Sequence, residues 1–136
     1  MSGETSLNEL LKTLSAQLVE DVYVFVTLPD DSVPENIAAR MVFRETEGTT
    51  LILQESEAEA FGLDYEFPCR MITLNVHSSL EAVGFIARIA SELTKQDMGV
   101  NPVSGFFHDH LFVPDGREHD AMRILEKIAR DSGKVD

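Results

Sequence analysis

Two histidines in the second half of the chain are spaced as metal ligands on a strand often are. His108 and His110 lie two residues apart, so on a continuous strand both side chains would point to the same face. A metal site would also need His77, His119 or a carboxylate to converge on the pair, and Asp109 points to the other face. A hairpin turn rich in polar residues is the alternative interpretation of these histidines.

Cys69 is the only cysteine, which excludes an intrachain disulfide and a zinc site built from several cysteines. Its thiol could act as a nucleophile with a histidine as the base. It stands between Pro68 and Arg70 at the entry to an apolar stretch, where a small buried thiol is the commoner occupant. The sequence has no Gly-Lys-Ser/Thr phosphate loop, no Gly-x-Gly-x-x-Gly and no Gly-x-Ser-x-Gly. The usual motifs of nucleotide-binding enzymes and of acyl-transfer enzymes are therefore absent from the sequence.

The segment 76–80 offers a binding site for an anion. It joins an apolar strand to the predicted start of a helix, which has unpaired backbone N–H groups and the positive end of the helix dipole. A carboxylate or a phosphate could bind there without catalytic machinery. The candidate contacts are His77, Ser78, Ser79 and Leu80.

Two further residues could contribute to such a site. Gly84 lies inside the predicted helix, where a glycine costs about 1 kcal/mol relative to alanine. Close approach of a strand, a subunit or a ligand would compensate for this cost, and so would tight packing of the helix on the sheet. Asp109, at the predicted hairpin, could accept an ammonium or guanidinium group, or it could stabilise the turn.

The elements that must position these residues follow a regular order in the second half. They are a strand over 71–76, a helix begun by Ser78 and ended by Gly99, strands over 103–107 and 111–113, and a last helix opened by Asp115 and Glu118. The helix start at Ser78 depends on Glu81, its capping-box partner. The order strand, helix, strand, strand, helix lacks one strand of a split βαβ unit.

The first half contains a related set of elements in a different order. The patterns predict a helix with a leucine face from Leu7 to Leu18, strands over 22–28, 41–45 and 49–54, and a short helix over 58–61. Ser6 and Glu9 form a capping box for the first helix, and Pro29 ends the first strand. We expect the strand over 22–28 to supply the strand that the second half lacks.

Composition excludes several classes of function. The 136 residues include 11 basic and 24 acidic side chains, a formal net charge of −13. Nucleic acid and anionic membrane surfaces are poor partners for such a chain, because their binding depends on clustered Lys and Arg. A hydrophobic fraction of 43% is typical of a folded domain. The N-terminus lacks the pattern of a signal peptide and no apolar run approaches ~20 residues, so we expect a cytoplasmic protein.

Two longer motifs carry a resemblance to a known family. They are Cys-Arg-Met-Ile-Thr-Leu-Asn-Val-His-Ser-Ser-Leu-Glu-Ala-Val-Gly-Phe-Ile-Ala from Cys69 and Phe-His-Asp-His-Leu-Phe-Val-Pro from Phe107. Together they resemble the ACT domain, and more narrowly the small bacterial tandem-ACT proteins, which are related to the ACT repeats of aspartate kinase and of the animal cytosolic arginine sensor. The resemblance covers nearly the whole chain and is weaker before Pro68.

The resemblance implies an α+β, ferredoxin-like fold of two intertwined ACT-like βαββαβ subdomains, residues 1–68 and 69–136. It also implies a non-enzymatic regulatory protein, without cofactor or metal, that binds a free amino acid or a similar zwitterion and forms a homodimer. The ligand carboxylate would bind at His77, Ser78, Ser79 and Leu80, with Gly84 as the helix glycine and Asp109 as the contact for a cationic group.

Some expectations from the resemblance stay open. The first repeat lacks a glycine-containing crossover after Pro29, so it would form either a second pocket or one wall of the first. No catalytic domain accompanies the repeats, so any regulation would act on a separate protein. The alternative function is an ACT-fold interaction or oligomerisation module without a ligand, whose pocket region would be filled by its own side chains, such as Phe106 or Phe107.

Overall fold

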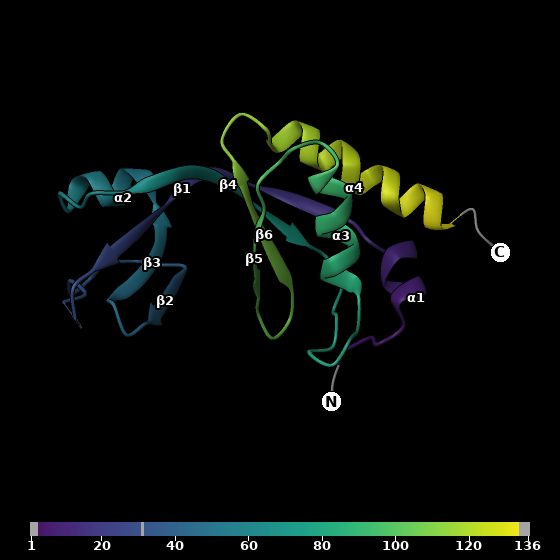
Figure 1. Cartoon of the computed structure of the whole chain (residues 1–136), viewed down its shortest axis with the longest axis horizontal. Coiled ribbons are helices and arrows are strands. Elements are labelled where there is room, and N and C mark those ends of the chain that lie inside the picture. Colours follow the sequence, from purple (N-terminus) through teal and green to yellow (C-terminus); the bar gives the residue numbers. More distant parts are fainter. Residues whose placement is uncertain (1–2, 31, 134–136) are drawn as a thin grey trace. The chain divides into compact units, whose positions relative to one another are not determined.

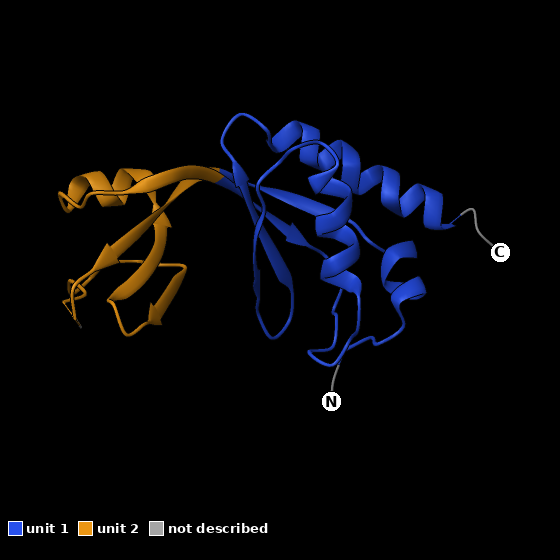
Figure 2. Ribbon diagram, in the orientation of Figure 1, with its two compact units in different colours: residues 1–20, 70–136 blue, residues 21–69 orange. Residues whose placement is uncertain are grey.

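The computed structural model describes residues 3–30 and 32–133, which form two compact units. Unit 1 comprises residues 1–20 and 70–136, and unit 2 comprises residues 21–69 (Figure 2). Unit 2 is therefore one continuous stretch of chain that interrupts the sequence of unit 1.

Six strands and four helices make up the described chain (Figure 1). The strands are β1 (Ala16–Leu28), β2 (Met41–Arg44), β3 (Thr49–Gln54), β4 (Glu66–Leu74), β5 (Asn101–Ser104) and β6 (Asp109–Pro114). The helices are α1 (Leu7–Lys12), α2 (Glu55–Ala60), α3 (Phe85–Thr94) and α4 (Glu118–Gly133). None of the helices in the described ranges combines the length and the hydropathy that crossing a membrane requires.

Both units have the strand order of a ferredoxin-like sheet. The order is β1-β4-β6-β5 in unit 1 and β2-β3-β1-β4 in unit 2. Two long strands serve both sheets, because β1 has its residues 16–20 in unit 1 and the rest in unit 2, while β4 has residues 70–74 in unit 1. Each sheet thus depends on a strand that the other unit shares, and this confirms the intertwined α+β fold.

The core of unit 1 joins three helices to the sheet. Its buried side chains include Ile72 and Leu74 of β4, Leu111 and Val113 of β6, Ile89 and Leu93 of α3, Leu125 of α4, and Leu10 and Leu11 of α1. Apolar residues three and four apart on each helix create the face that packs inward. This packing fixes both ends of the loop between β4 and α3, which carries the candidate site residues.

Unit 2 has a smaller core of its own. It consists of Val24 and Val26 of β1, Leu51 and Leu53 of β3, and Ala58 of α2. The alternation of these strand residues puts one face of the sheet toward the core. β3 begins and ends where the sequence predicts, at Thr49 and Gln54, and is paired antiparallel with both β1 and β2.

The first predicted helix is too long. α1 ends at Lys12, and Leu18, which we expected on its apolar face, lies in β1. The capping box is confirmed in one of its two bonds: Ser6 Oγ accepts a hydrogen bond from the Glu9 backbone N–H at 3.4 Å, but the Ser6 N–H donates to Glu4 Oε1 at 3.1 Å rather than to Glu9. The strand that neighbours β4 in unit 1 is confirmed as β1, but through its residues 16–20 rather than through the predicted segment 22–28, which belongs to unit 2.

The predicted start of the second-half helix is wrong. α3 begins at Phe85, and Gly84 is its N-cap with a left-handed backbone (φ +90°), not an interior residue. The Glu81 backbone N–H donates to Ser79 Oγ at 3.1 Å, and the Ala82 N–H donates to the Ser79 carbonyl at 2.9 Å. These bonds close a local turn around Ser79. A serine hydroxyl that bonds nearby backbone competes with helix formation.

Candidate ligand site in unit 1

A pocket of about 270 Å³ lies in unit 1 where three segments meet. The segments are the loop after β4, the first turn of α3 and the β5–β6 hairpin (Figure 1). Its lining residues are Ser78, Ser79, Leu80, Ala82, Gly84, Phe85, Ile86, Ala87, Ser104, Gly105 and Asp109. Residues some 30 positions apart in the sequence thus form one concave surface.

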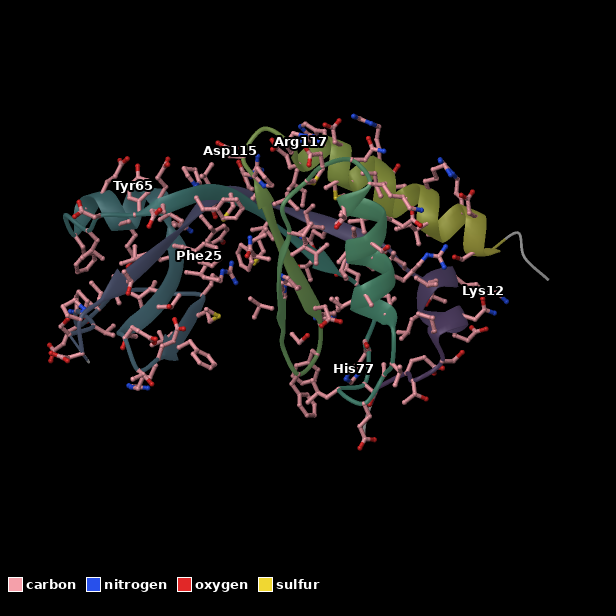
Figure 3. The ribbon with its side chains drawn as sticks, in the orientation of Figure 1. Lys12, Phe25, Tyr65, His77, Asp115 and Arg117 are labelled. Atoms are coloured by element: carbon pink, nitrogen blue, oxygen red, sulfur yellow. The ribbon has the colours of Figure 1, made fainter. Side chains whose placement is uncertain are left out.

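Five of the six predicted site residues line this pocket: Ser78, Ser79, Leu80, Gly84 and Asp109. His77, the sixth, is not among the lining residues. Its ring lies against two aromatic rings of the β5–β6 hairpin, at centroid distances of 6.3 Å from Phe106 and 5.6 Å from Phe107. His77 therefore contacts the hairpin rather than the pocket (its position is shown in Figure 3).

The first turn of α3 lines one part of the pocket. Phe85, Ile86 and Ala87 line it, and the first backbone bond within the helix is donated by Arg88, to the Gly84 carbonyl at 2.9 Å. No side chain in the described part of the chain caps this end, because Gly84 has none to offer. The N–H groups before Arg88 and the positive end of the helix dipole therefore favour an anion at this place.

The loop before α3 is held by hydrogen bonds of its own. The Ser78 N–H donates to the Val76 carbonyl at 3.0 Å and the Ser79 N–H donates to the Glu4 carbonyl at 2.9 Å. These two amides, which the sequence placed at the helix start, already have acceptors. The amides of the observed helix start, in residues 85–87, thus lie further along the chain than those of the predicted start at Ser78.

Asp109 brings a carboxylate to the other side of the pocket. It is the first residue of β6, its relative exposure is 7%, and its Oδ1 accepts a hydrogen bond from Ser104 Oγ at 2.6 Å. Among the described residues that line the pocket, Asp109 is the one ionisable side chain. A cationic group is the natural partner for a buried carboxylate, since burial without a partner is costly.

The other candidate chemistry lacks support in the described residues. His110 Nδ1 lies 3.0 Å from Thr73 Oγ1, and the rings of His108 and His110 are 6.4 Å apart. No group of three His, Cys, Asp or Glu side chains within residues 3–30 and 32–133 is placed to hold a metal ion. Cys69 is buried in unit 2, where its thiol donates to the Tyr23 carbonyl at 3.3 Å.

Sequence patterns missed the contribution of the N-terminal segment to this region. Glu4 forms a parallel bridge with Ser78, and its N–H donates to the His77 carbonyl at 2.8 Å. Both contacts are made by backbone atoms, so no side-chain pattern could have indicated them. Ser104, which lies opposite Asp109 in the β5–β6 register, was also missed, because the predicted strands over 103–107 and 111–113 put Asp109 in the turn.

Comparison with known proteins places the chain in a family. Two models of the ACT domain match it, one over residues 2–70 and one over residues 66–127. The chain therefore belongs to the ACT domain family. A protein of unknown function from Vibrio cholerae, described as a possible transport protein, is 36% identical to it. The similarity covers 94% of this chain and 99% of that protein, with a TM-score of 0.82.

More distant solved structures share the fold. A protein from Agrobacterium tumefaciens is 14% identical over 85% of this chain and 89% of its own, with a TM-score of 0.73. The regulatory subunit of aspartate kinase from Thermus flavus is 8% identical over 85% of this chain and 95% of its own, with a TM-score of 0.59. No curated protein matches the sequence.

Proposed function

We propose that this protein is a non-enzymatic sensor that binds a free amino acid, or a similar zwitterion, in the pocket of unit 1. One observation carries the proposal: the pocket joins the uncapped N-terminus of α3 to the buried carboxylate of Asp109. An α-carboxylate would accept hydrogen bonds from the N–H groups of the first turn of α3. An ammonium or guanidinium group would bind Asp109.

The lining also limits the class of ligand. Its polar contacts come from backbone amides, from serine hydroxyls and from Asp109. No cationic side chain of the described residues lines the pocket. A ligand with a second negative charge would therefore face Asp109 without a counter-ion, so we propose neutral or cationic amino acids over acidic ones.

The regulatory role rests on the family. ACT domains are typically ligand-binding regulatory modules, and the solved neighbours include regulatory subunits of an amino-acid kinase. We propose that the ligand changes how this protein acts on a separate, cytoplasmic partner and that the chain works as a homodimer. Phe106 and Phe107, which could have filled the pocket, are 55% and 63% exposed and do not line it.

A melting screen against the twenty amino acids tests the binding proposal. A ligand at a hundredfold excess over its Kd stabilises a protein by about 2.7 kcal/mol, so the matching amino acid should raise Tm clearly in protein stripped of bound ligand. Asp109→Asn should weaken binding of that amino acid at least about tenfold, which corresponds to about 1.4 kcal/mol. Asparagine keeps an acceptor for Ser104 but removes the charge.

Asp115→Asn is the matched control for this variant. Asp115 is exposed, and Figure 3 shows it at the end of unit 1 away from His77. It should bind as the wild type does. Equal affinities of Asp109→Asn and the wild type, or the absence of a melting shift with every amino acid, would exclude the sensor function in this form.

One observation favours a second candidate, an interaction module. Large apolar side chains are exposed at Leu80, which lines the pocket, at Val83 in the same loop, and at Phe106 and Phe107 in the β5–β6 hairpin. Exposed apolar residues that gather in one region often mark contact surfaces. In that case no amino acid would raise Tm, while light scattering would show self-association that depends on protein concentration.

A further inference from the structure

We propose that the segment Gly3–Leu7 is a positioning element of the unit 1 pocket: it ties the loop after β4 to the N-cap of α3, and it thereby sets the affinity of the site. The claim about affinity, the ligand arm, rests on the proposed amino-acid binding. The claim that the segment holds the loop after β4 in place, the structural arm, does not. The segment contacts two parts of the pocket, the loop after β4 and the N-cap of α3.

The first contact is made by backbone pairing. The Glu4 N–H donates to the His77 carbonyl at 2.8 Å, and the Glu4 carbonyl accepts from the Ser79 N–H at 2.9 Å. Glu4 therefore makes hydrogen bonds to the residues on both sides of Ser78, as a residue in a parallel strand does. Ser79, with only 4% relative exposure, depends on this bond to satisfy its amide. Without Glu4, the buried N–H of a pocket residue would lose its acceptor.

The second contact reaches the N-cap of α3. A β-carbon added to Gly84 would stand 3.5 Å from Leu7 Cδ2, so the leucine side chain lies directly over the glycine backbone. Leu7 itself packs on the unit 1 core as the first residue of α1. The packing of α1 on the core thus fixes the position of Leu7 against Gly84, the N-cap of α3.

Several local contacts fix the backbone of the segment Gly3–Leu7. Glu4 Oε1 accepts from the Ser6 N–H at 3.1 Å, and Ser6 Oγ caps α1. Gly3 has a left-handed backbone with φ +97°, which L side chains rarely adopt. A β-carbon at Gly3 would stand 2.7 Å from Ser79 N and 2.9 Å from Ser79 Cα, closer than real β-carbons approach backbone. Only glycine lets the segment approach the loop this closely.

Gly3→Ala tests the structural arm. The added methyl group must push the segment away from Ser79, so amide hydrogen exchange at Ser79 should accelerate at least about tenfold, equivalent to about 1.4 kcal/mol of lost protection. Gly116→Ala is the matched control. Gly116 has nearly the same backbone strain (φ +100°), lies in unit 1 and has no atom within 4 Å of an added β-carbon. It should leave the exchange of Ser79 unchanged.

Leu7→Ala tests the second contact by affinity. In the melting screen, the amino acid that stabilises the wild type should bind Leu7→Ala and Gly3→Ala at least about tenfold more weakly. Leu18→Ala is the control, because Leu18 is also a partly buried leucine on the unit 1 core but does not come within 4 Å of a β-carbon added to Gly84. It should retain the affinity of the wild type.

The outcomes separate this inference from the function that it builds on. Faster exchange in Gly3→Ala but not in Gly116→Ala supports the positioning element even if no amino acid binds the wild type. Unchanged exchange in Gly3→Ala overturns it whatever binds. If an amino acid binds the wild type and both segment variants equally, the segment does not set the affinity and the inference is wrong.

Discussion

At the scale of single residues, Arg70 and Glu118 form the most enclosed ion pair described in unit 1. Their charged atoms are 3.0 Å apart, and the side chains are 15% and 10% exposed. Arg70 also donates to the Val19 and Glu20 carbonyls, and Glu118 accepts from the Gly116 N–H at 2.7 Å. The pair therefore attaches the first turn of α4 to β4 and to the end of the unit 1 part of β1.

Glu118 should make the stability of the protein sensitive to acid. Burial raises its pKa, but backbone N–H groups of Glu118 and Gly116 and the Arg70 charge outweigh this, so the pKa lies below its ordinary value. A carboxyl group with a lowered pKa in the folded state contributes stability above its unfolded pKa, about 4.3, and loses it as the pH falls through the folded pKa. Urea unfolding from pH 6 down to about pH 3 should show this loss.

Glu118→Gln isolates that contribution. At neutral pH the variant should be about 3 kcal/mol less stable, because Arg70 stays buried without its counter-ion. The difference from the wild type should shrink as the pH falls into the acidic range. Glu126→Gln, an exposed substitution on the same helix, should follow the wild type. Parallel curves for Glu118→Gln and the wild type at every pH would contradict the assigned role.

The sequence predicted most of the residues that line the pocket, but it did not predict which backbone amides lie at the start of α3. Ser78 and Ser79 were predicted as the start of a helix with unpaired backbone N–H groups, and Asp109 as a carboxylate for a cationic group; all three line one pocket. His77 was predicted from its neighbourhood in sequence, but its ring lies against Phe106 and Phe107. The amides of the α3 first turn carry no side-chain signal, since every residue except proline has an N–H group. The boundary between the two sequence repeats at residues 68 and 69 stays a prediction.

At the scale of elements, the start of α3 decides which amides are available. The pair Ser78 and Glu81 has the spacing of a capping box, but in the structure Ser79 bonds the Glu81 N–H and closes a turn instead. The same short pattern thus serves two local structures, and the left-handed Gly84 decides between them. The strand β3 was predicted to the residue, because a short apolar run, Leu51 to Leu53, lies between the Gly48 turn and an acidic segment.

Gly84→Ala distinguishes the two positions of the helix start by sign. Inside a helix, replacing glycine by alanine would raise the unfolding free energy by about 1 kcal/mol. At an N-cap with φ +90°, alanine is strained and should lower it by about 1 kcal/mol. Denaturant unfolding of the wild type and the variant measures the difference. A more stable variant would show that α3 extends through Gly84.

At the scale of the whole molecule, the shared strands β1 and β4 make the two sequence halves interdependent. β1 borders β4 in the unit 1 sheet, and Leu10, Leu11 and Leu14 of the first 20 residues belong to the unit 1 core. The family resemblance suggested this arrangement, but the sequence could not say which residues of β1 serve which unit. Strand pairing at long sequence separation leaves no local pattern to read.

Residues 69–136 expressed alone should not form a stable monomer. The fragment lacks β1 and α1, so one edge of β4 and a large part of the unit 1 core would lose their neighbours. Unpaired strand edges and exposed apolar surface favour aggregation. Circular dichroism during urea titration and light scattering should show a non-cooperative or associated chain, whereas the full chain unfolds cooperatively. A stable monomeric fragment would contradict the interdependence.

The interruption of unit 1 by unit 2 has a consequence for biosynthesis. On a ribosome the complete sequence of unit 2 emerges once residue 69 has cleared the exit tunnel, whereas the first 20 residues of unit 1 must wait for the last helix before their core can close. Since domains generally fold as units during synthesis, we expect unit 2 to fold before unit 1. The pocket receives its N-terminal contacts from residues made first and its β5–β6 hairpin from residues made much later, so it is assembled only after Asp109 has been translated.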